Sequence, residues 1–176
     1  VVVCKSPLTD TWGDANCGGT FGPHLKFAGY DGILFSGIAD DPVYLNIDEG
    51  KAELRDAAFL WGKDSNETED MLRETLGATK RRKIEVASIG QAGENLSLVS
   101  AVMNDKGRAA GRSGVGAVMG SKKLKAIAVT GKAKVPLFDA DKAKALRKEY
   151  LKRTGGAYDL FVDYGTIGIT GDSAMS

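Results

Sequence analysis

The sequence has 176 residues, enough for one domain with a hydrophobic core or for part of a larger one. Its 24 lysines and arginines balance 23 aspartates and glutamates, and the net charge of +1 argues against a nucleic-acid-binding protein, which needs a strongly basic face. Two cysteines are too few for a disulfide framework or a cluster with four cysteine ligands, and no apolar run approaches the roughly 18 residues of a membrane span.

A short strand pattern and a loop pattern share the first 20 positions. Residues 1–4 are apolar and strand-like, whereas residues 5–20 contain turn-forming pairs and predict a loop. Within it, Asn16 can offer a side-chain amide and a main-chain carbonyl, and Gly18 and Gly19 allow a ligand to approach the backbone closely. An isolated asparagine of this kind can equally satisfy its own turn.

Strand patterns dominate the next region. Residues 32–37 are a short apolar run closed by glycines, and we expect a strand there. Residues 43–47 and 51–55 flank a turn at 48–50, which predicts a β-hairpin. Residues 84–89 indicate one further strand.

Two helices are expected around that last strand. The first has its N-cap within residues 64–66, carries acidic residues in its first turns and ends at Gly77. The second is indicated by apolar residues spaced along one edge between 96 and 103. Glu94 and Asn95 stand at its start, either as helix-end residues or as supports for the glycine-rich stretch that follows.

That glycine-rich stretch covers residues 104–130. Its basic residues include Arg108 and Arg112, and its glycines are Gly107, Gly111, Gly114, Gly116 and Gly120. Glycine exposes main-chain amides, and arginine forks and amides together bind phosphates and flat anions. The apolar residues 124–129 predict a buried strand that anchors the stretch. We therefore predict a rigid anion-binding loop, with a tight structural turn as the alternative.

Two nucleotide-binding motifs fit this loop poorly. The P-loop pattern is absent, because Ser121 separates Gly120 from Lys122. Residues 114–120 resemble a loose dinucleotide fingerprint, but no strand precedes them and few residues remain for a crossover helix. A Rossmann site is therefore a minor alternative.

A change in composition near residues 132–136 predicts a domain boundary, with one domain over residues 1–133 and a second over residues 134–176. Beyond the boundary, Asp139 or Asp141 can cap a charged helix that continues to residue 151 and turns Leu146 and Tyr150 inward. The patterns together predict an α+β fold: mostly antiparallel sheets with a few helices, followed by the start of a helical domain.

Three blocks of the sequence resemble the aldehyde ferredoxin oxidoreductase family. They are WGDANCGG with FGPHLKFAGYD (residues 12–19 and 21–31), IGQAGEN with MND (89–95 and 103–105), and AAGRSGVGAVMGSKKLKAI (109–127). The blocks stand in the family's order and span nearly the whole chain. The resemblance implies an N-terminal cofactor-binding domain, incomplete at its N-terminus, whose sheets form a base for a bis-pterin cofactor.

The resemblance also implies roles for individual residues. The family's counterpart of Asn16 helps to bind a magnesium ion between two pterin phosphates, and the second carbonyl ligand would come from Ala109. The guanidinium groups would pair with the phosphates, and glycine amides would bond along the pterin rings. The expected cofactor-binding residues are Asn16, Gly18, Gly19, Arg108, Ala109, Ala110, Gly111, Arg112, Gly114 and Gly116. No residue of this chain is expected to be catalytic.

By resemblance, the intact enzyme oxidises aldehydes to carboxylic acids at a tungsten, or molybdenum, centre held by two pterins. Electrons would pass to ferredoxin through a [4Fe–4S] cluster ligated outside this sequence. We expect a soluble cytoplasmic protein, without nucleic-acid or membrane partners, in an enzyme that can form a homodimer. Two alternatives are a subunit of a class II aromatic-acyl-CoA reductase of the same family and a standalone phosphate- or nucleotide-binding module.

Overall fold

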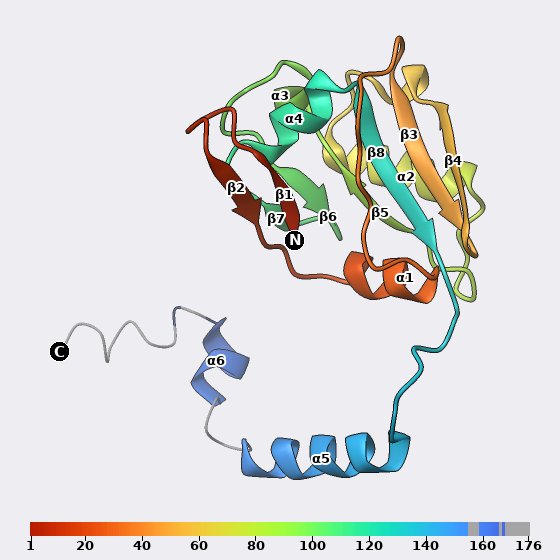
Figure 1. The fold of residues 1–176 in the computed structure, drawn as a ribbon, viewed down its shortest axis with the longest axis vertical. Coiled ribbons are helices and arrows are strands. Elements are labelled where there is room, and N and C mark those ends of the chain that lie inside the picture. The colour runs from red at the N-terminus through yellow and green to blue at the C-terminus, as the bar shows by residue number, and fades with distance from the viewer. Residues whose placement is uncertain (155–158, 166, 168–176) are drawn as a thin grey trace, which may run out of the picture. The chain divides into compact units, whose positions relative to one another are not determined.

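The computed structural model describes residues 1–154, 159–165 and 167 and falls into two compact units (Figure 1). The units are Val1–Val135 and Pro136–Ser176, a division slightly beyond the boundary predicted at residues 133 and 134. Within the predicted second domain, residues 155–158, 166 and 168–176 lie outside the described residues.

A six-stranded sheet in the order β4-β3-β8-β5-β6-β7 organises the first unit. Its strands are β3 (Val43–Asp48), β4 (Lys51–Asp56), β5 (Glu85–Ser88), β6 (Val102–Asn104), β7 (Arg108–Ala110) and β8 (Leu124–Thr130). Neighbouring strands run antiparallel, except β3 and β8, which are parallel. A separate antiparallel hairpin consists of β1 (Val2–Lys5) and β2 (Trp12–Ala15). The predicted α+β fold with mostly antiparallel sheets is confirmed.

The predicted hairpin is confirmed as the β3–β4 pair. Its turn residues, Glu49 (φ 48°) and Gly50 (φ 88°), both adopt the left-handed region that a two-residue turn of type I′ requires. β4 is exposed along its whole length and forms one edge of the sheet, where its charged side chains oppose pairing with another chain.

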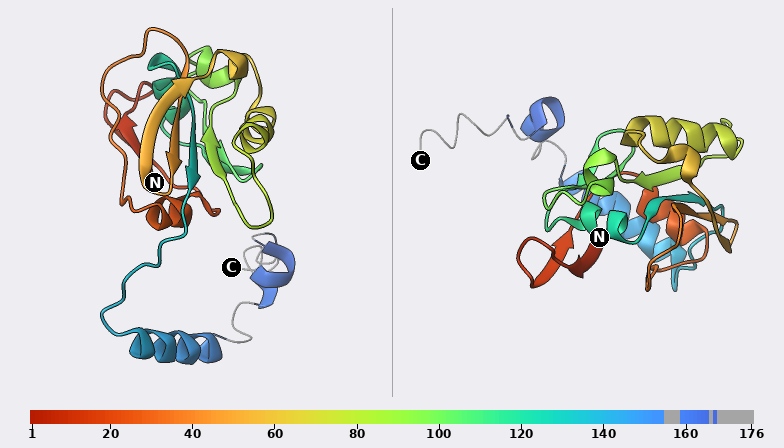
Figure 2. Two further views of the ribbon diagram at one scale, coloured as in Figure 1. Left: turned by 90° about the vertical axis from the view of Figure 1, so that its right-hand side faces the viewer. Right: turned by 90° about the horizontal axis from the view of Figure 1, so that it is seen from above.

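Helices cover both faces of the six-stranded sheet. On one face, α2 (Ser65–Thr75) and the 3₁₀-helix η1 (Ala58–Leu60) bury Leu72 and Leu60 against Ala126 and Ala128 of β8. On the other face lie the β1–β2 hairpin, α1 (Phe21–Phe27) and α4 (Val115–Ser121), as Figure 2 shows. The predicted buried strand at residues 124–129 is therefore confirmed as β8, a central strand with both faces covered.

The start of α2 also follows the prediction. Asp64 is its N-cap, and its carboxylate accepts hydrogen bonds of 2.8 Å from the N–H groups of Asn66 and Glu67. The Glu67 carboxylate in turn accepts a hydrogen bond from the Asp64 N–H, which completes a capping box. Gly77, with φ 72°, follows the helix at its C-terminal end.

Two predictions near the N-terminus are wrong: a loop that includes residues 12–15 and a strand over residues 32–37. Residues 12–15, predicted as loop, form β2, because Gly13 and Ala15 alternate inward along it. Residues 32–37, predicted as a strand, have no strand partner. Ile33 and Phe35 pack on the core there, while Leu34 between them is 95% exposed, so a few apolar anchors hold the segment in place of a ladder.

Two predictions around the glycine-rich stretch are also wrong. The helix expected over residues 96–103 is replaced by the short α3 (Gln91–Glu94), a turn in which Leu96 takes a φ of 58°, and strand β6. Residues 115–121, predicted as part of a loop, form α4. Gly93 and Gly120 let α3 and α4 pack closely: a Cβ on Gly120 would lie 1.9 Å from the Gly93 carbonyl oxygen.

The second unit contains α5 (Ala140–Arg153) and α6 (Asp159–Tyr164). Asp139 caps α5 by accepting a 2.8 Å hydrogen bond from the Lys142 N–H, as predicted. Leu146 and Tyr150, predicted to turn inward, are exposed, and α5 has no buried residue. Within the described ranges, no helix of either unit is both long and apolar enough to cross a membrane.

Candidate functional site

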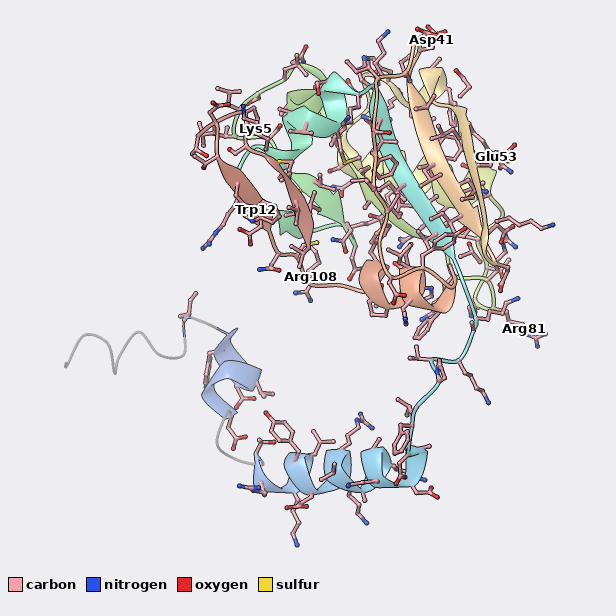
Figure 3. All side chains as sticks on the ribbon, viewed as in Figure 1. Lys5, Trp12, Asp41, Glu53, Arg81 and Arg108 are labelled. Atoms are coloured by element: carbon pink, nitrogen blue, oxygen red, sulfur yellow. The ribbon has the colours of Figure 1, made fainter. Side chains whose placement is uncertain are left out.

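The two glycine-bearing segments predicted to share a ligand lie against each other. We name residues 16–19 the first bend and residues 105–113, which include β7, the second bend. A Cβ on Gly18 would lie 3.4 Å from Arg108 Nη1, and a Cβ on Gly19 would lie 3.3 Å from Arg108 Cγ. The Arg108 side chain, labelled in Figure 3, therefore lies against both glycines of the first bend.

A second contact joins the far end of the second bend to β2, the strand that leads into the first bend. A Cβ on Gly13 would lie 2.7 Å from Ser113 Cβ, so only glycine leaves room for this serine. Ser113 Oγ lies 3.5 Å from the main-chain oxygen of Asp14, to which it donates a long hydrogen bond. The two bends are therefore in contact at more than one point.

The β6–β7 hairpin sets the direction of the second bend. Its turn residues Asp105 (φ 49°) and Lys106 (φ 52°) both take left-handed conformations. Lys106 ties this turn to α2: its N–H donates to Glu69 Oε2 at 3.2 Å, and its ammonium pairs with Asp70 at 2.6 Å. The turn of the hairpin is thereby held against α2 while Arg108 lies along the first bend.

Most of the predicted ligand residues are exposed where the bends meet. Ala110 is buried in the core, and the exposed ones are Asn16, Gly18, Gly19, Arg108, Ala109, Gly111 and Arg112. Neither arginine has an ion-pair partner in the part of the chain that the structure describes. Phosphate groups bind to such guanidinium donors, and hard cations such as Mg²⁺ prefer oxygen ligands like main-chain carbonyls.

Gly114 and Gly116, like Ala110, are predicted residues that lie away from this exposed surface. A Cβ on Gly114 would lie 2.4 Å from Leu98 O, and a Cβ on Gly116 would lie 2.6 Å from Ala101 O. The Gly116 N–H already donates to Ser100 O at 3.1 Å. Close packing of α4 on residues 98–101 thus explains why glycine stands at both positions.

Glu94 has a structural role away from the second bend, contrary to one alternative above. Its carboxylate pairs with the fully buried Lys125 and accepts hydrogen bonds of 2.9 and 3.0 Å from the Gly62 N–H. Lys125 Nζ also donates to Lys63 O at 2.7 Å. Burial lowers the pKa of Lys125, and the hydrogen bond and charge of Glu94 oppose that shift. This ion pair joins α3, β8 and the segment after η1.

A cavity of about 650 Å³ borders the place where the bends meet. Gly18, Gly19 and Asn104 line it together with apolar side chains that include Phe21, Phe35 and Met119. The first bend therefore forms part of the cavity wall, together with Asn104, the residue that precedes the second bend. The backbone of exposed residues such as Asn16 and Ala109, together with the guanidinium groups of Arg108 and Arg112, is a donor set compatible with a phosphorylated pterin pair and magnesium.

Sequence reasoning missed two residues at this junction. Asn104 and Ser113 both contact the first bend or the strand before it, and neither was predicted as a site residue. For Asn104 the only signal is its place in the MND block, since an asparagine before a turn is ordinary in any loop.

Comparisons with known proteins agree on one family. The family model described as aldehyde ferredoxin oxidoreductase, N-terminal domain, matches residues 1–131. The tungsten-containing aldehyde ferredoxin oxidoreductase of Pyrococcus furiosus is 52% identical over 152 residues, which cover 86% of this chain and 25% of that protein. The protein of the same name from Thermococcus kodakarensis is 51% identical with the same coverage. The chain thus spans about a quarter of the length of these relatives.

Two matches at lower identity are to proteins whose names describe other substrates. The aliphatic sulfonate oxidoreductase, WOR-like subunit, of P. furiosus is 37% identical over 161 residues, covering 86% of this chain and 26% of that protein. Among solved structures, the active site complex BamBC of benzoyl coenzyme A reductase with 1,5-dienoyl-CoA superposes with a TM-score of 0.81 at 37% identity. That match covers 85% of this chain and 22% of the BamBC chain.

Proposed function

The chain belongs to the aldehyde ferredoxin oxidoreductase family, and on that premise we propose that it is the cofactor-binding portion of a tungsten-dependent oxidoreductase that converts aldehydes to carboxylic acids. The observation that carries the proposal is the contact between the first and second bends. Segments about 90 residues apart in sequence bring the exposed Gly18 and Gly19 against Arg108, and further exposed residues of the second bend follow Arg108 in the chain.

In this proposal each bend contributes one oxygen ligand, and the second bend also supplies the two arginines that would hold the phosphates. The main-chain carbonyls of Asn16 and Ala109 would hold the magnesium ion. Arg108 and Arg112 would pair with the pterin phosphates through charge-assisted hydrogen bonds. The exposed backbone of Gly18, Gly19 and Gly111 would bind the pterins, and Ala110 fixes the second bend to the core.

A bound tungsten (or molybdenum) bis-pterin centre supplies the two-electron chemistry that oxidises the aldehyde. The residues of this chain bind and orient that centre. Acid–base groups, the [4Fe–4S] cluster and the surface that meets ferredoxin belong to the remainder of the full-length enzyme, which forms a homodimer in this proposal. The names of the tungsten-containing relatives support the metal and the electron acceptor.

The similarity to BamBC favours one alternative within the same family. A subunit of a class II aromatic-acyl-CoA reductase would use the same bends to hold its cofactor. The higher identity to the aldehyde oxidoreductases, 52% against 37%, favours aldehyde oxidation. A standalone nucleotide-binding module is the weaker reading, because the matched family model covers residues 1–131.

The test is analysis of the full-length protein purified without oxygen. We expect tungsten or molybdenum, magnesium and pterin in the ratio of a bis-pterin centre, and aldehyde-dependent reduction of ferredoxin. Reduction of an aromatic acyl-CoA in place of aldehyde oxidation selects the alternative subunit. A protein with neither metal nor pterin refutes both readings.

A further inference from the structure

Asn104 lies where the two bends touch. It is the last residue of β6, pairs with Arg108 across the β6–β7 hairpin and is 2% exposed. Its Nδ2 donates to Cys17 Sγ at 3.2 Å and, over a longer distance of 3.5 Å, to the main-chain oxygen of Arg108. One buried amide therefore contacts a residue of each bend.

The other end of this amide faces Gly19. A Cβ on Gly19 would lie 2.4 Å from Asn104 Oδ1, and Gly19 has a φ of 95°, so only glycine suits this position. Oδ1 itself is buried and has no hydrogen-bond partner within the described residues. The opposite orientation of the amide would place Oδ1 against the Arg108 carbonyl oxygen, so the donor must face Arg108.

Leaving a buried polar atom without a partner costs free energy, and such groups in folded proteins call for an explanation. A leucine would fill the same space without that cost. It would, however, lose the donor that reaches both bends. The arrangement is therefore better suited to fixing the relative position of the bends than to stability.

We propose that Asn104 is a positioning residue that sets the spacing between the Asn16 and Ala109 carbonyls. Its contacts, Cys17 and Arg108, are the immediate neighbours of those two residues in the chain. Magnesium demands near-ideal octahedral geometry, so the separation of two carbonyl ligands from different segments must be held closely. The identity of the ligand rests on the proposed function, whereas the contacts of Asn104 do not.

The experiment compares full-length wild type with Asn104→Asp, Asn104→Ala and a matched control, Asn66→Asp, which makes the same chemical change at an exposed position of α2. Two quantities are measured on protein purified without oxygen: magnesium retained after dialysis against a chelator, and the rate at which iodoacetamide labels Cys17, located by peptide mass spectrometry. Loss of a residue that orients metal ligands weakens metal binding about 10-fold or more. We expect both Asn104 variants to show that loss of magnesium together with faster labelling of Cys17. Asn66→Asp should match wild type in both measurements.

Acid pH separates positioning from a general loss of packing. The carboxyl group introduced by Asn104→Asp regains a donor when it is protonated, so its magnesium retention relative to wild type rises as pH falls. Asn104→Ala has no such group and shows no recovery. Asn104→Ala also keeps the test informative if the buried charge of the aspartate prevents folding.

The proposal is overturned if both Asn104 variants retain magnesium like wild type, or if Cys17 labelling is unchanged in them. Wild-type protein that contains neither magnesium nor pterin overturns the proposed function instead. In that case the Cys17 labelling rates still decide the positioning role, because they depend only on the contact between Asn104 and the first bend.

Discussion

The guanidinium group of Arg108 occupies the space beside Gly18, where a Cβ would lie 3.4 Å from Nη1. Neither residue alone forms a binding surface: the glycine exposes backbone, and the arginine supplies the charge that lies over it. Their contact links two segments that are far apart in sequence and makes the account testable at single residues.

Replacing Arg108 and Arg112 with alanine should empty the site without unfolding the sheet. Each charge-assisted hydrogen bond contributes about 1.5–3 kcal/mol, so each arginine that contacts a phosphate should change cofactor affinity by roughly 10- to 100-fold. Tungsten and pterin content of the full-length variants measures this, with circular dichroism to confirm the fold. Arg55→Ala, on the exposed strand β4, is the matched control. Wild-type occupancy in the double variant would remove both arginines from the site.

Gly19→Ala should disturb the junction, whereas Gly22→Ala should not. A Cβ on Gly19 meets Asn104 Oδ1 at 2.4 Å and forces alanine into a φ of 95°, while a Cβ on Gly22 meets nothing within 4 Å. We expect about 1 kcal/mol or more of local strain at Gly19 and reduced cofactor content. Hydrogen exchange of residues 16–19 and 105–113 reports the disturbance. Equal exchange in the two variants would contradict the contact.

Gly120→Ala should separate α3 from α4. A Cβ at this position would lie 1.9 Å from the Gly93 carbonyl oxygen, and neither backbone can yield without moving its helix. Overpacking of this kind costs about 1–3 kcal/mol, which thermal unfolding of the full-length protein measures. Gly107→Ala, which meets nothing within 4 Å, should leave the transition unchanged. An unshifted transition in Gly120→Ala would show that the helices are not packed this closely.

Lys125→Met should be strongly destabilising, because it leaves the Glu94 carboxylate buried without its cation. Breaking a buried pair on one side costs about 3–5 kcal/mol. Adding Glu94→Gln should recover part of that loss, so the two effects will not add. Hydrogen exchange protection of the β8 amides measures the change. Additive losses would indicate that the two groups do not interact.

The same ion pair predicts a pH dependence. Burial lowers the pKa of Lys125 below its ordinary value of 10.5, so between the folded-state pKa and 10.5 the unfolded chain binds more protons than the folded one. This group therefore makes stability rise with pH across that window. Comparing β8 amide protection in wild type and in Lys125→Met as pH increases isolates the effect. If β8 amide protection in wild type fell relative to Lys125→Met as pH increases across this window, the pH dependence would have the opposite sign. That result would contradict the burial of a charged lysine.

Local patterns were enough to predict the elements whose causes lie within a few residues. The β3–β4 hairpin follows from alternation around a turn at Glu49-Gly50, and α2 follows from the Asp64 cap and the acidic first turn. The resemblance located both bends, but it did not establish that they touch. Their contact depends on how the β1–β2 hairpin meets the six-stranded sheet, which no local pattern encodes.

The wrong predictions share a cause in tertiary packing. The glycines among residues 115–121 predict part of a loop, but the structure forms α4 there, and Gly116 and Gly120 leave room for residues 100–101 and for α3. Lys125 lies within the predicted buried strand at residues 124–129, but its pairing with the buried Glu94 carboxylate appears only in the structure. A glycine or lysine has the same local signature in both settings, so only the partner across the fold distinguishes them.

The most direct test is an experimental structure of the full-length protein, purified and crystallised without oxygen and with its cofactor bound. The account predicts pterin phosphates within hydrogen-bond distance of Arg108 or Arg112, and a magnesium ion coordinated by one carbonyl from residues 16–19 and one from residues 105–113. A cofactor held elsewhere on the chain, or held by only one of the two bends, would contradict it.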